Sequence, residues 1–431
     1  MKFYDHPGKE LWEEIACRPS FQNSHVFDEV RPILERVQKE GDKAIKEYTL
    51  QYDRIDLENF QVTEEEFAEA ERILPVELKD SIGLASRNIW VFHNQQLIKE
   101  AMVDTMPGIV CWRKMVGIEK VGIYIPGGTA PLFSTVLMLG VPASIAGCKE
   151  IVMCTPPQEN GSVHPAMLYA ASMAGIKKVY KVGGAQAIAG MAFGTATIPA
   201  VYKIFGPGNQ FVTAAKMLIQ QQGIAIDMPA GPSEVMVVAD ATAVPEFVAA
   251  DLLSQAEHGV DSQVMLIAKP EFDYAGFEQA LEKQLNNLGR KGLASKALEN
   301  SRVIIFDEDA EIMQFADLYA PEHLVLCTRN AAALADRVTN AGSVFVGNYS
   351  PESAGDYASG TNHTLPTNGF ARMYSGVNVE SFSKIITFQS LTKEGLQAIA
   401  QSVITMANAE ELDAHAEAIK IRLNNGRESN S

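Results

Sequence analysis

The chain has 431 residues, of which 47% are hydrophobic and 21% are charged, and its net charge at pH 7 is −17. This length predicts two or three folding units, and the composition is that of an ordinary globular protein rather than a disordered one. The negative charge argues against nucleic acid and anionic membrane as partners, because both present phosphate groups that would repel the protein. We therefore expect small-molecule ligands.

No export or membrane signal is visible in the sequence. Residues 1–20 carry four acidic side chains where a secretory signal needs a basic start and an apolar run. The most apolar stretch, 116–154, is interrupted by prolines, glycines and Lys149, which argues against a membrane span. The five cysteines form neither a Cys-x-x-Cys pair nor an even framework, as expected for reduced thiols. These features predict a cytoplasmic protein.

The first hundred residues predict helices. Residues 26–52 have helical periodicity, Thr63 and Glu66 form a capping-box pattern before 67–74, and a further helix is expected over 76–97.

From Ile109 onward the pattern changes to short β-rich runs separated by Gly, Pro and helical segments. The runs are 121–125, 150–155, 177–182, 201–205, 234–239, 263–268, 303–306, 323–327 and 343–346. Strands that alternate with helices predict βαβ units and mainly parallel sheet. So many strands exceed a comfortable single open sheet, so we expect two α/β domains, with 124–233 forming one of them. Beyond Ser381 the strand signals stop, and 391–423 predicts an amphipathic helical appendage.

Three predicted strands end in turns of small residues. The turns begin at Pro126, Gly183 and Gly206. Ligands bind at the carboxyl ends of strands in open α/β sheets, so the three turns together make a plausible dinucleotide cradle. Each is weak by itself: Phe211 stands where the third glycine of a Rossmann fingerprint would be, and tight-turn geometry alone explains any one of them.

The segment 251–259 offers possible metal ligands. Gln255 and His258 are three residues apart in a predicted helix, so they share a face and could reach one ion. A histidine near a helix end, just before Gly259, is equally explained by capping, and we favour that interpretation from this stretch alone.

Two later segments also hold candidates. Glu322 and His323 put an acid and a base side by side at the start of a predicted strand, which suits repeated proton transfer, although a solvated turn would look the same. The predicted irregular loop 347–369 contains Asp356 and His363, an oxygen donor and an imidazole that could complete a metal site or lie on a surface loop. His415, alone on the C-terminal helix, has no spacing that marks it as a ligand.

Several phrases in order resemble the histidinol dehydrogenase family, over nearly the whole chain. They are Tyr-Ile-Pro-Gly-Gly from Tyr124, Gly-Gly-Ala-Gln-Ala from Gly183, Phe-Gly-Pro-Gly-Asn from Phe205, Asp-Met-Pro-Ala-Gly-Pro-Ser-Glu from Asp227, Leu-Ser-Gln-Ala-Glu-His-Gly from Leu253, Ala-Pro-Glu-His-Leu from Ala320, and Gly-Asp-Tyr-Ala-Ser-Gly-Thr-Asn-His-Thr-Leu-Pro-Thr from Gly355.

The resemblance implies a function for each candidate. One zinc ion per subunit would be held by Gln255, His258, Asp356 and His415, the last from the partner subunit of a homodimer with shared active sites. Glu322 and His323 match the acid/base pair, and Tyr124, Gln186 and Asn209 match the NAD contacts. The residues that match substrate positions are Ser233, Gln255, His258, His323, Asp356, His363, Glu410 and His415. The implied reaction is the oxidation of L-histidinol to L-histidine through the aldehyde, with two NAD.

The implied fold is α/β, with two Rossmann-like parallel-sheet domains, one inserted in the other, and small helical segments at both ends. We expect an N-terminal helical segment at 1–23, a discontinuous first domain at 24–122 and 236–380 with the metal and substrate site, an inserted domain at 123–235 with the NAD contacts, and a C-terminal helical dimerisation segment at 381–431.

Two other interpretations compete with this one. A related NAD-linked alcohol dehydrogenase with another hydroxy substrate need not keep Glu410, His363 and His415 together, and all three are present. A non-catalytic zinc or nucleotide-binding protein would have no use for the adjacent Glu322 and His323.

Overall fold

The computed structural model describes residues 1–18, 24–97, 101–127, 130–229 and 231–424. The chain divides into two units, one formed by 1–96 with 118–382 and the other by 97–117 with 383–431. Among the helices of the described ranges, none combines the length and apolar character that crossing a membrane requires.

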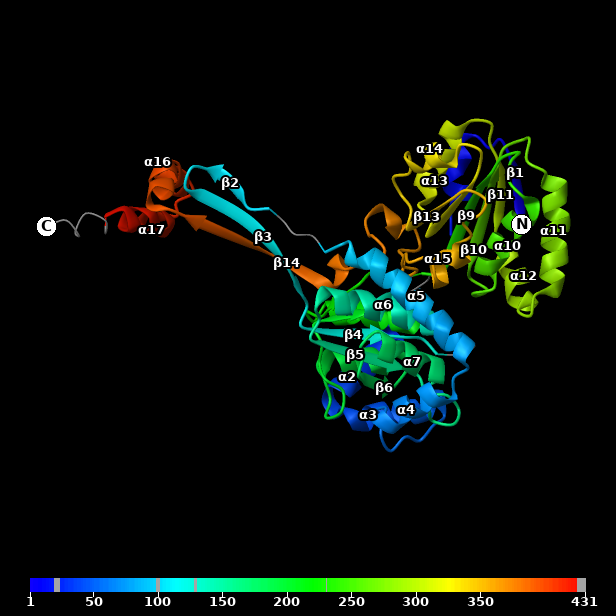
Figure 1. The fold of residues 1–431 in the computed structure, drawn as a ribbon, viewed down its shortest axis with the longest axis horizontal. Helices are drawn as coiled ribbons and strands as arrows, with labels where there is room; N and C mark the ends of the chain where they lie inside the picture. Colours follow the sequence, from blue (N-terminus) through cyan, green and yellow to red (C-terminus); the bar gives the residue numbers. More distant parts are fainter. Residues whose placement is uncertain (19–23, 98–100, 128–129, 230, 425–431) are drawn as a thin grey trace. The chain divides into compact units, whose positions relative to one another are not determined.

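The first unit contains two parallel sheets (Figure 1). The five-stranded sheet has the order β6-β5-β4-β7-β8 and comprises β4 (Lys120–Tyr124), β5 (Glu150–Thr155), β6 (Lys178–Lys181), β7 (Lys203–Phe205) and β8 (Ala225–Ile226). The six-stranded sheet has the order β1-β11-β10-β9-β12-β13 and comprises β1 (Lys2–Asp5), β9 (Glu234–Ala239), β10 (Gln263–Ala268), β11 (Arg302–Ile305), β12 (His323–Cys327) and β13 (Ser343–Val346). In each sheet the chain runs outward in one direction and then returns to the middle, so the strand order reverses between β4 and β7 and between β9 and β12. Both sheets are therefore Rossmann-like, as expected.

Helices cover both faces of each sheet because successive strand residues point to opposite sides. On the five-stranded sheet, Tyr124, Val152 and Ile204 pack with one group of helices, whereas Ile123, Met153 and Phe205 pack with another. The first group is α2 (Ser24–Glu40), α3 (Asp42–Tyr48), α8 (Gly184–Phe193) and α9 (Gln210–Gln220), and the second is α4 (Glu64–Ile73), α5 (Val76–Asn94), α6 (Phe133–Ala146) and α7 (Pro165–Met173).

The six-stranded sheet is covered in the same way. One face packs against α10 (Pro245–Ala256), α11 (Tyr274–Asn287) and α12 (Lys291–Glu299), and the other against α1 (Trp12–Ile15), α13 (Asp309–Tyr319) and α14 (Ala331–Ala335). Short helices elsewhere are η1 (Lys9–Leu11), η2 (Thr49–Asp53), α15 (Glu352–Tyr357), η3 (Phe370–Arg372) and η4 (Glu380–Phe382).

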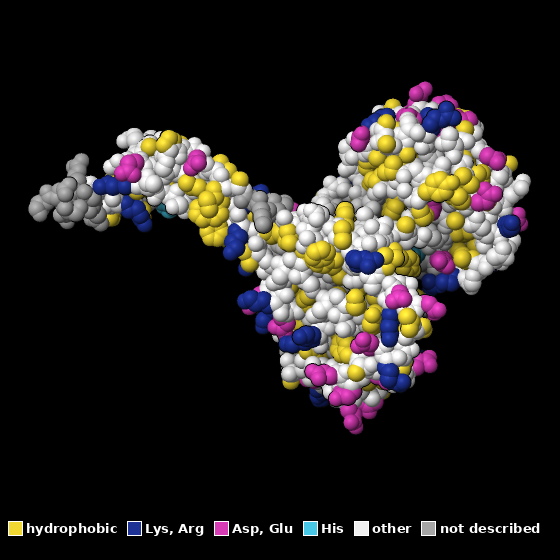
Figure 2. Space-filling model, viewed as in Figure 1, with side chains coloured by type: hydrophobic (Ala, Val, Ile, Leu, Met, Phe, Trp, Pro, Cys, Tyr) yellow, Lys and Arg dark blue, Asp and Glu magenta, His cyan; other side chains and the backbone are white. Residues whose placement is uncertain are grey.

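The second unit is a three-stranded antiparallel sheet with two helices. The strands are β2 (Val103–Met106), β3 (Ile109–Gly117) and β14 (Ser383–Leu391), and the helices are α16 (Lys393–Ala409) and α17 (Asp413–Asn424). Few of its residues are buried, and many apolar side chains of its strands and helices are exposed (Figure 2).

All nine predicted strands are confirmed, and Thr63 and Glu66 form the predicted capping box. Several other expectations need correction. The N-terminal segment, expected to be helical, begins with the strand β1, which pairs with β11. Beyond Ser381 the chain does not turn wholly helical, because β14 pairs with β3 along its whole length. The loop 347–369 contains the helix α15.

The helical region 24–94 also packs differently from the expectation. It was expected to share a domain with 236–380, but α2 lies against α8 and α9, α4 against α7, and α5 against α6, all on the five-stranded sheet. Periodicity in the sequence predicts a helix with an apolar face and does not specify which sheet that face meets. The exact domain boundaries stay a prediction.

Candidate functional site

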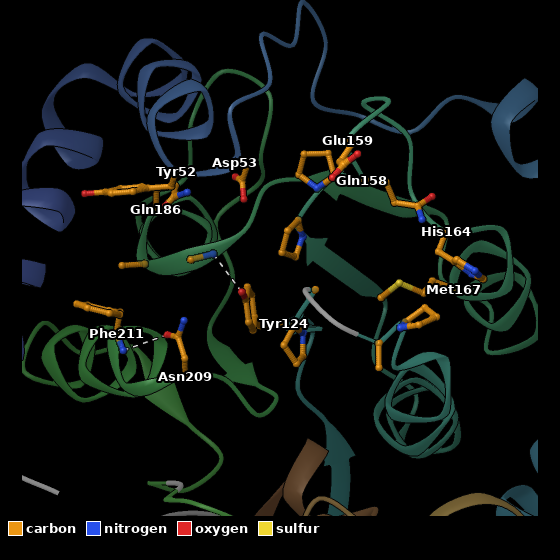
Figure 3. Close-up of a pocket in the computed structure, with 18 of the residues that line it drawn as sticks. Tyr52, Asp53, Tyr124, Gln158, Glu159, His164, Met167, Gln186, Asn209 and Phe211 are labelled. Atoms are coloured by element: carbon orange, nitrogen blue, oxygen red, sulfur yellow. Dashed lines mark hydrogen bonds between the residues drawn. The ribbon is translucent and has the colours of Figure 1, made fainter. Parts of the chain in front are cut away.

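A cavity of about 910 Å³ opens at the carboxyl ends of β4, β6 and β7 (Figure 3). Tyr124, Gln186 and Asn209, the three predicted NAD contacts, all line it. Tyr124 is the last residue of β4, and its hydroxyl accepts a hydrogen bond of 3.0 Å from the N–H of Gly184 at the start of α8. Asn209 caps α9, with its Oδ1 accepting from the N–H groups of Phe211 and Val212 at 3.1 Å each. Gly128 and Thr129 of the first small-residue turn lie outside the described residues.

The turn after β7 is held by a buried polar network. Lys216 and Asp227 form a buried ion pair, Lys216 Nζ donates to the Gly206 carbonyl at 2.9 Å, and the Gly206 N–H donates to Asp227 at 2.8 Å. Gly206 has a φ of +121°, and a Cβ there would collide with the carbonyl oxygen of Tyr124. Glycine is thus required where β7 approaches β4.

A second cavity, of about 590 Å³, is lined by the predicted catalytic, metal-binding and substrate-binding residues of the first unit. Its lining includes all seven of the predicted substrate, metal and acid/base residues of that unit, namely Ser233, Gln255, His258, Glu322, His323, Asp356 and His363. Pro126 and Asn209 line both cavities, so the two adjoin. The strands β9 and β12 present their amino ends here, where Ser233 precedes β9 and His323 begins β12.

The backbone of Glu234 orients the acid/base pair. Its N–H donates to Glu322 Oε2 at 2.8 Å, and its carbonyl is 3.0 Å from His323 Nδ1. Because a carbonyl only accepts, Nδ1 carries a proton, so the neutral form of the imidazole would accept a proton through Nε2. Nε2 is buried without a hydrogen-bond partner and lies 3.7 Å from Asp356 Oδ1.

Burial and the neighbouring charges shift the pKa values of both Glu322 and His323. Burial raises the pKa of Glu322 to about 8, an effect that His323 partly offsets. Burial by itself would lower the pKa of His323, but the carboxylates of Glu322, Glu352 and Asp356 outweigh it and raise the pKa to about 10.

Three side chains form a candidate metal group. Ligand atoms of His258, Glu352 and Asp356 lie within 4.8 Å of one another. One oxygen of Glu352 and Oδ1 of Asp356 are buried without hydrogen-bond partners, an arrangement that is costly for carboxylates unless a cation lies nearby. Gln255 joins the group: with its amide oxygen and nitrogen exchanged, the orientation that satisfies both ends, the amide donates to Glu352 and accepts from the Glu234 N–H at 3.1 Å. These donors fit a zinc ion, which binds imidazole and carboxylate ligands.

His363 contacts the same group through the backbone of Asp356. Its Nδ1 lies 2.9 Å from the carbonyl of Asp356, and its Nε2 lies 3.0 Å from Thr135 Oγ1. Glu410 and His415 belong to the second unit, where both are exposed: Glu410 caps the end of α16 and His415 lies in the first turn of α17.

Arg18, Glu234 and Glu352 were missed by the sequence analysis. Arg18 forms an ion pair with the buried Glu234 carboxylate, with Nη2 at 2.9 Å from Oε2, and its guanidinium stacks on the Tyr319 ring. Glu234 closes one of the phrases that carry the family resemblance, so a signal existed for it. No motif or spacing marks Arg18 or Glu352.

Comparison with known proteins gives a consistent result. The family model described as histidinol dehydrogenase matches residues 16–423. A histidinol dehydrogenase of Bacteroides thetaiotaomicron is 56% identical over 98% of this chain and 99% of its own length, and that of Escherichia coli (strain K12) is 48% identical over 96% and 95%. The crystal structure of histidinol dehydrogenase from Elizabethkingia anophelis matches 99% of this chain and 98% of its own with a TM-score of 0.96 and 52% identity.

Proposed function

The chain belongs to the histidinol dehydrogenase family and is an oxidoreductase of histidine biosynthesis, and on this premise we propose that it oxidises L-histidinol to L-histidine through L-histidinaldehyde, with zinc and two NAD. The observation that carries the proposal is the buried Glu322–His323 pair, which shares a cavity with His258 and Asp356 and adjoins a second cavity lined by Tyr124, Gln186 and Asn209.

The proposed zinc ligands are Gln255, His258, Asp356 and His415 of the partner subunit. The orphaned oxygens of Asp356 and Glu352 support a cation at this position. When bound, zinc would hold the imidazole and amine of the substrate in place, and its charge would offset the carboxylates around His323. Ser233, His363 and Glu410 complete the proposed substrate contacts.

His323 is the proposed general base of both oxidation steps. With Nδ1–H donated to the Glu234 carbonyl, Nε2 takes the proton of the substrate hydroxyl while the hydride leaves for NAD. The product of this step is the aldehyde. Glu322, whose pKa of about 8 lies close to neutrality, takes a proton from the water that adds to the aldehyde. His323, having released the first proton to solvent, then accepts the proton of the hydrate as the second hydride leaves for the second NAD.

The proposed assembly is a homodimer in which each site draws Glu410 and His415 from the other subunit. The second unit supports it, since its exposed apolar side chains offer a surface for a second copy. They are Met102, Val103, Met106, Ile385, Ile386, Phe388, Met406, Leu412 and Ile421. The cytoplasmic location stays a prediction.

NADH formation with L-histidinol tests the reaction directly. We expect about two NADH per histidinol consumed, with loss of activity on chelation and recovery on zinc addition, because each hydride reduces one NAD. If a zinc-loaded dimer fails to turn over histidinol, the proposal is wrong and the related alcohol dehydrogenase with another substrate takes its place.

Metal analysis separates the ligands from the acid/base pair. The variants Asp356→Asn and His258→Asn should lose bound zinc, whereas Glu322→Gln should keep zinc and lose turnover of the aldehyde. Full zinc content in Asp356→Asn would contradict the proposed ligand set.

A further inference from the structure

The larger cavity is acidic at one side. Three carboxylates line it, those of Glu29, Asp53 and Glu159, and no Lys or Arg among the described residues does so. In Figure 3, Asp53 and Glu159 lie along one side of the cavity, and Tyr124 and Asn209 lie along the other. An anionic group on a ligand would be repelled from that side.

Among these three carboxylates, Asp53 is the one with a buried oxygen that accepts no hydrogen bond. It ends η2, and its Oδ2 is buried without a hydrogen-bond partner. Burial raises the pKa of this carboxyl to about 6. Glu29, by contrast, has a partner on its own helix, since it lies 2.9 Å from His25 Nδ1. A buried acceptor of this kind is suited to the hydroxyl groups of a ligand, which would satisfy it.

The position of Asp53 indicates which half of a bound dinucleotide it would contact. The nicotinamide must reach His323, so it belongs where the two cavities adjoin, beside Pro126 and Asn209. Glu29, Tyr52, Asp53 and Glu159 line only the larger cavity. The adenosine half would therefore extend towards them.

We propose that Asp53 accepts hydrogen bonds from the ribose hydroxyls of the adenosine half and thereby sets the preference for NAD over NADP. An aspartate on the 2′-hydroxyl is a known physical solution to this choice, because a 2′-phosphate in the same place meets a negative charge and no cation. The inference rests on the proposed use of NAD.

The test compares Asp53→Asn with the wild type and with Asp56→Asn. Asp56 is three residues away, is paired with Lys46 at 3.1 Å and does not line the cavity, so it is a matched control. Binding of NAD and NADP is measured by calorimetry on the zinc-loaded protein, and the KM and kcat of histidinol oxidation are measured with each dinucleotide.

In Asp53→Asn we expect NAD affinity to fall about tenfold, as for loss of a hydrogen bond to a charged group, with the KM for histidinol unchanged. The ratio of NAD to NADP affinity should fall about tenfold or more, because the repulsion of the 2′-phosphate is also removed. Asp56→Asn should keep both values. The thermal midpoint of Asp53→Asn should equal or exceed that of the wild type, since a partly buried carboxylate whose Oδ2 has no partner is removed.

An unchanged ratio of NAD to NADP affinity in a folded Asp53→Asn would overturn the inference and leave the proposed function standing. Failure of the wild type to bind NAD or to reduce it with histidinol would instead overturn the proposed function, and the inference with it.

Discussion

At the scale of single residues, the backbone of one residue arranges the reacting side chains. The N–H and C=O of Glu234 hold Glu322 and His323, and the Glu234 side chain is itself fixed by Arg18 and by the Asn368 N–H at 2.9 Å. The first residue of β9 therefore sets the orientation of both the acid and the base.

The first prediction concerns His323. The variant His323→Gln should lower kcat by roughly 10²–10⁴-fold, the usual contribution of a positioned general base, because glutamine cannot take the proton. Zinc content and NAD affinity should stay close to wild-type values. Steady-state kinetics with metal analysis checks this, and a kcat within tenfold of the wild type would rule out His323 as the base.

The second prediction concerns Asp251, a buried carboxyl on α10 that the proposed mechanism does not use. Burial raises its pKa to about 7 in the folded protein, whereas an unfolded aspartate titrates near 4. Below pH 4 the group is protonated in both states and has no effect. As the pH rises towards 7 the unfolded chain ionises first, so the free energy of unfolding decreases, and above 7 the loss is complete.

The variant Asp251→Asn should not show this decrease in the free energy of unfolding with rising pH. We expect the variant to be more stable than the wild type by about 1–3 kcal/mol at pH 8 and nearly equal at pH 4. Urea unfolding at the two pH values measures the difference. A stability change that does not vary with pH would show that the charge of Asp251 is not its cause.

At the scale of elements, the close approach of two strand ends places Gly206 in the lining of the smaller cavity, beside the Tyr124 backbone. The turn after β7 passes against the last residue of β4, and only a residue without a side chain fits at Gly206. The Lys216–Asp227 pair beneath it then holds both backbone groups of that glycine.

Gly206→Ala should therefore destabilise the protein by roughly 2–4 kcal/mol and weaken NAD binding, because the clash with Tyr124 must push the turn away. Gly223→Ala is the matched control: its φ is also positive, at +88°, but a Cβ there meets nothing within 4 Å, so only about 1 kcal/mol of backbone strain is expected. Thermal unfolding and NAD titration of both variants measure the effects. Equal losses in the two variants would contradict the importance of the close approach.

At the scale of the whole molecule, the second unit is too small to bury its own apolar residues. Trp112 and Phe388 stack across β3 and β14 with ring centroids 5.3 Å apart, yet Ile385 is 47% exposed and Met406 is 64% exposed. Burial against a second copy would remove this surface from water.

Mixed dimers test whether His415 acts across the subunits. Homodimers of His258→Asn and of His415→Asn should both be inactive. A purified heterodimer of the two should recover about half of wild-type activity, because one of its two sites then combines an intact His258 with an intact His415 of the partner subunit. An inactive heterodimer of normal size would show that His415 acts within its own subunit.

The sequence by itself determined the local structure and the family. The nine strands were found because each is a short apolar run between turn residues, and the capping box because Thr63 and Glu66 are close in the chain. The ordered phrases also identified Ser233, Gln255, His258, Glu322, His323, Asp356 and His363, which the fold then brought to one cavity.

Only the tertiary structure decided what depends on contacts between distant segments. The strand β14 was missed because most of its residues are exposed, so no alternation of buried and polar positions marks it. The packing of α2–α5 on the five-stranded sheet, the Arg18–Glu234 pair and the place of Glu352 beside Asp356 each join residues far apart in sequence or spaced without a motif. Such partners follow from how apolar faces and buried charges are satisfied in three dimensions, and the order of residues along the chain does not specify them.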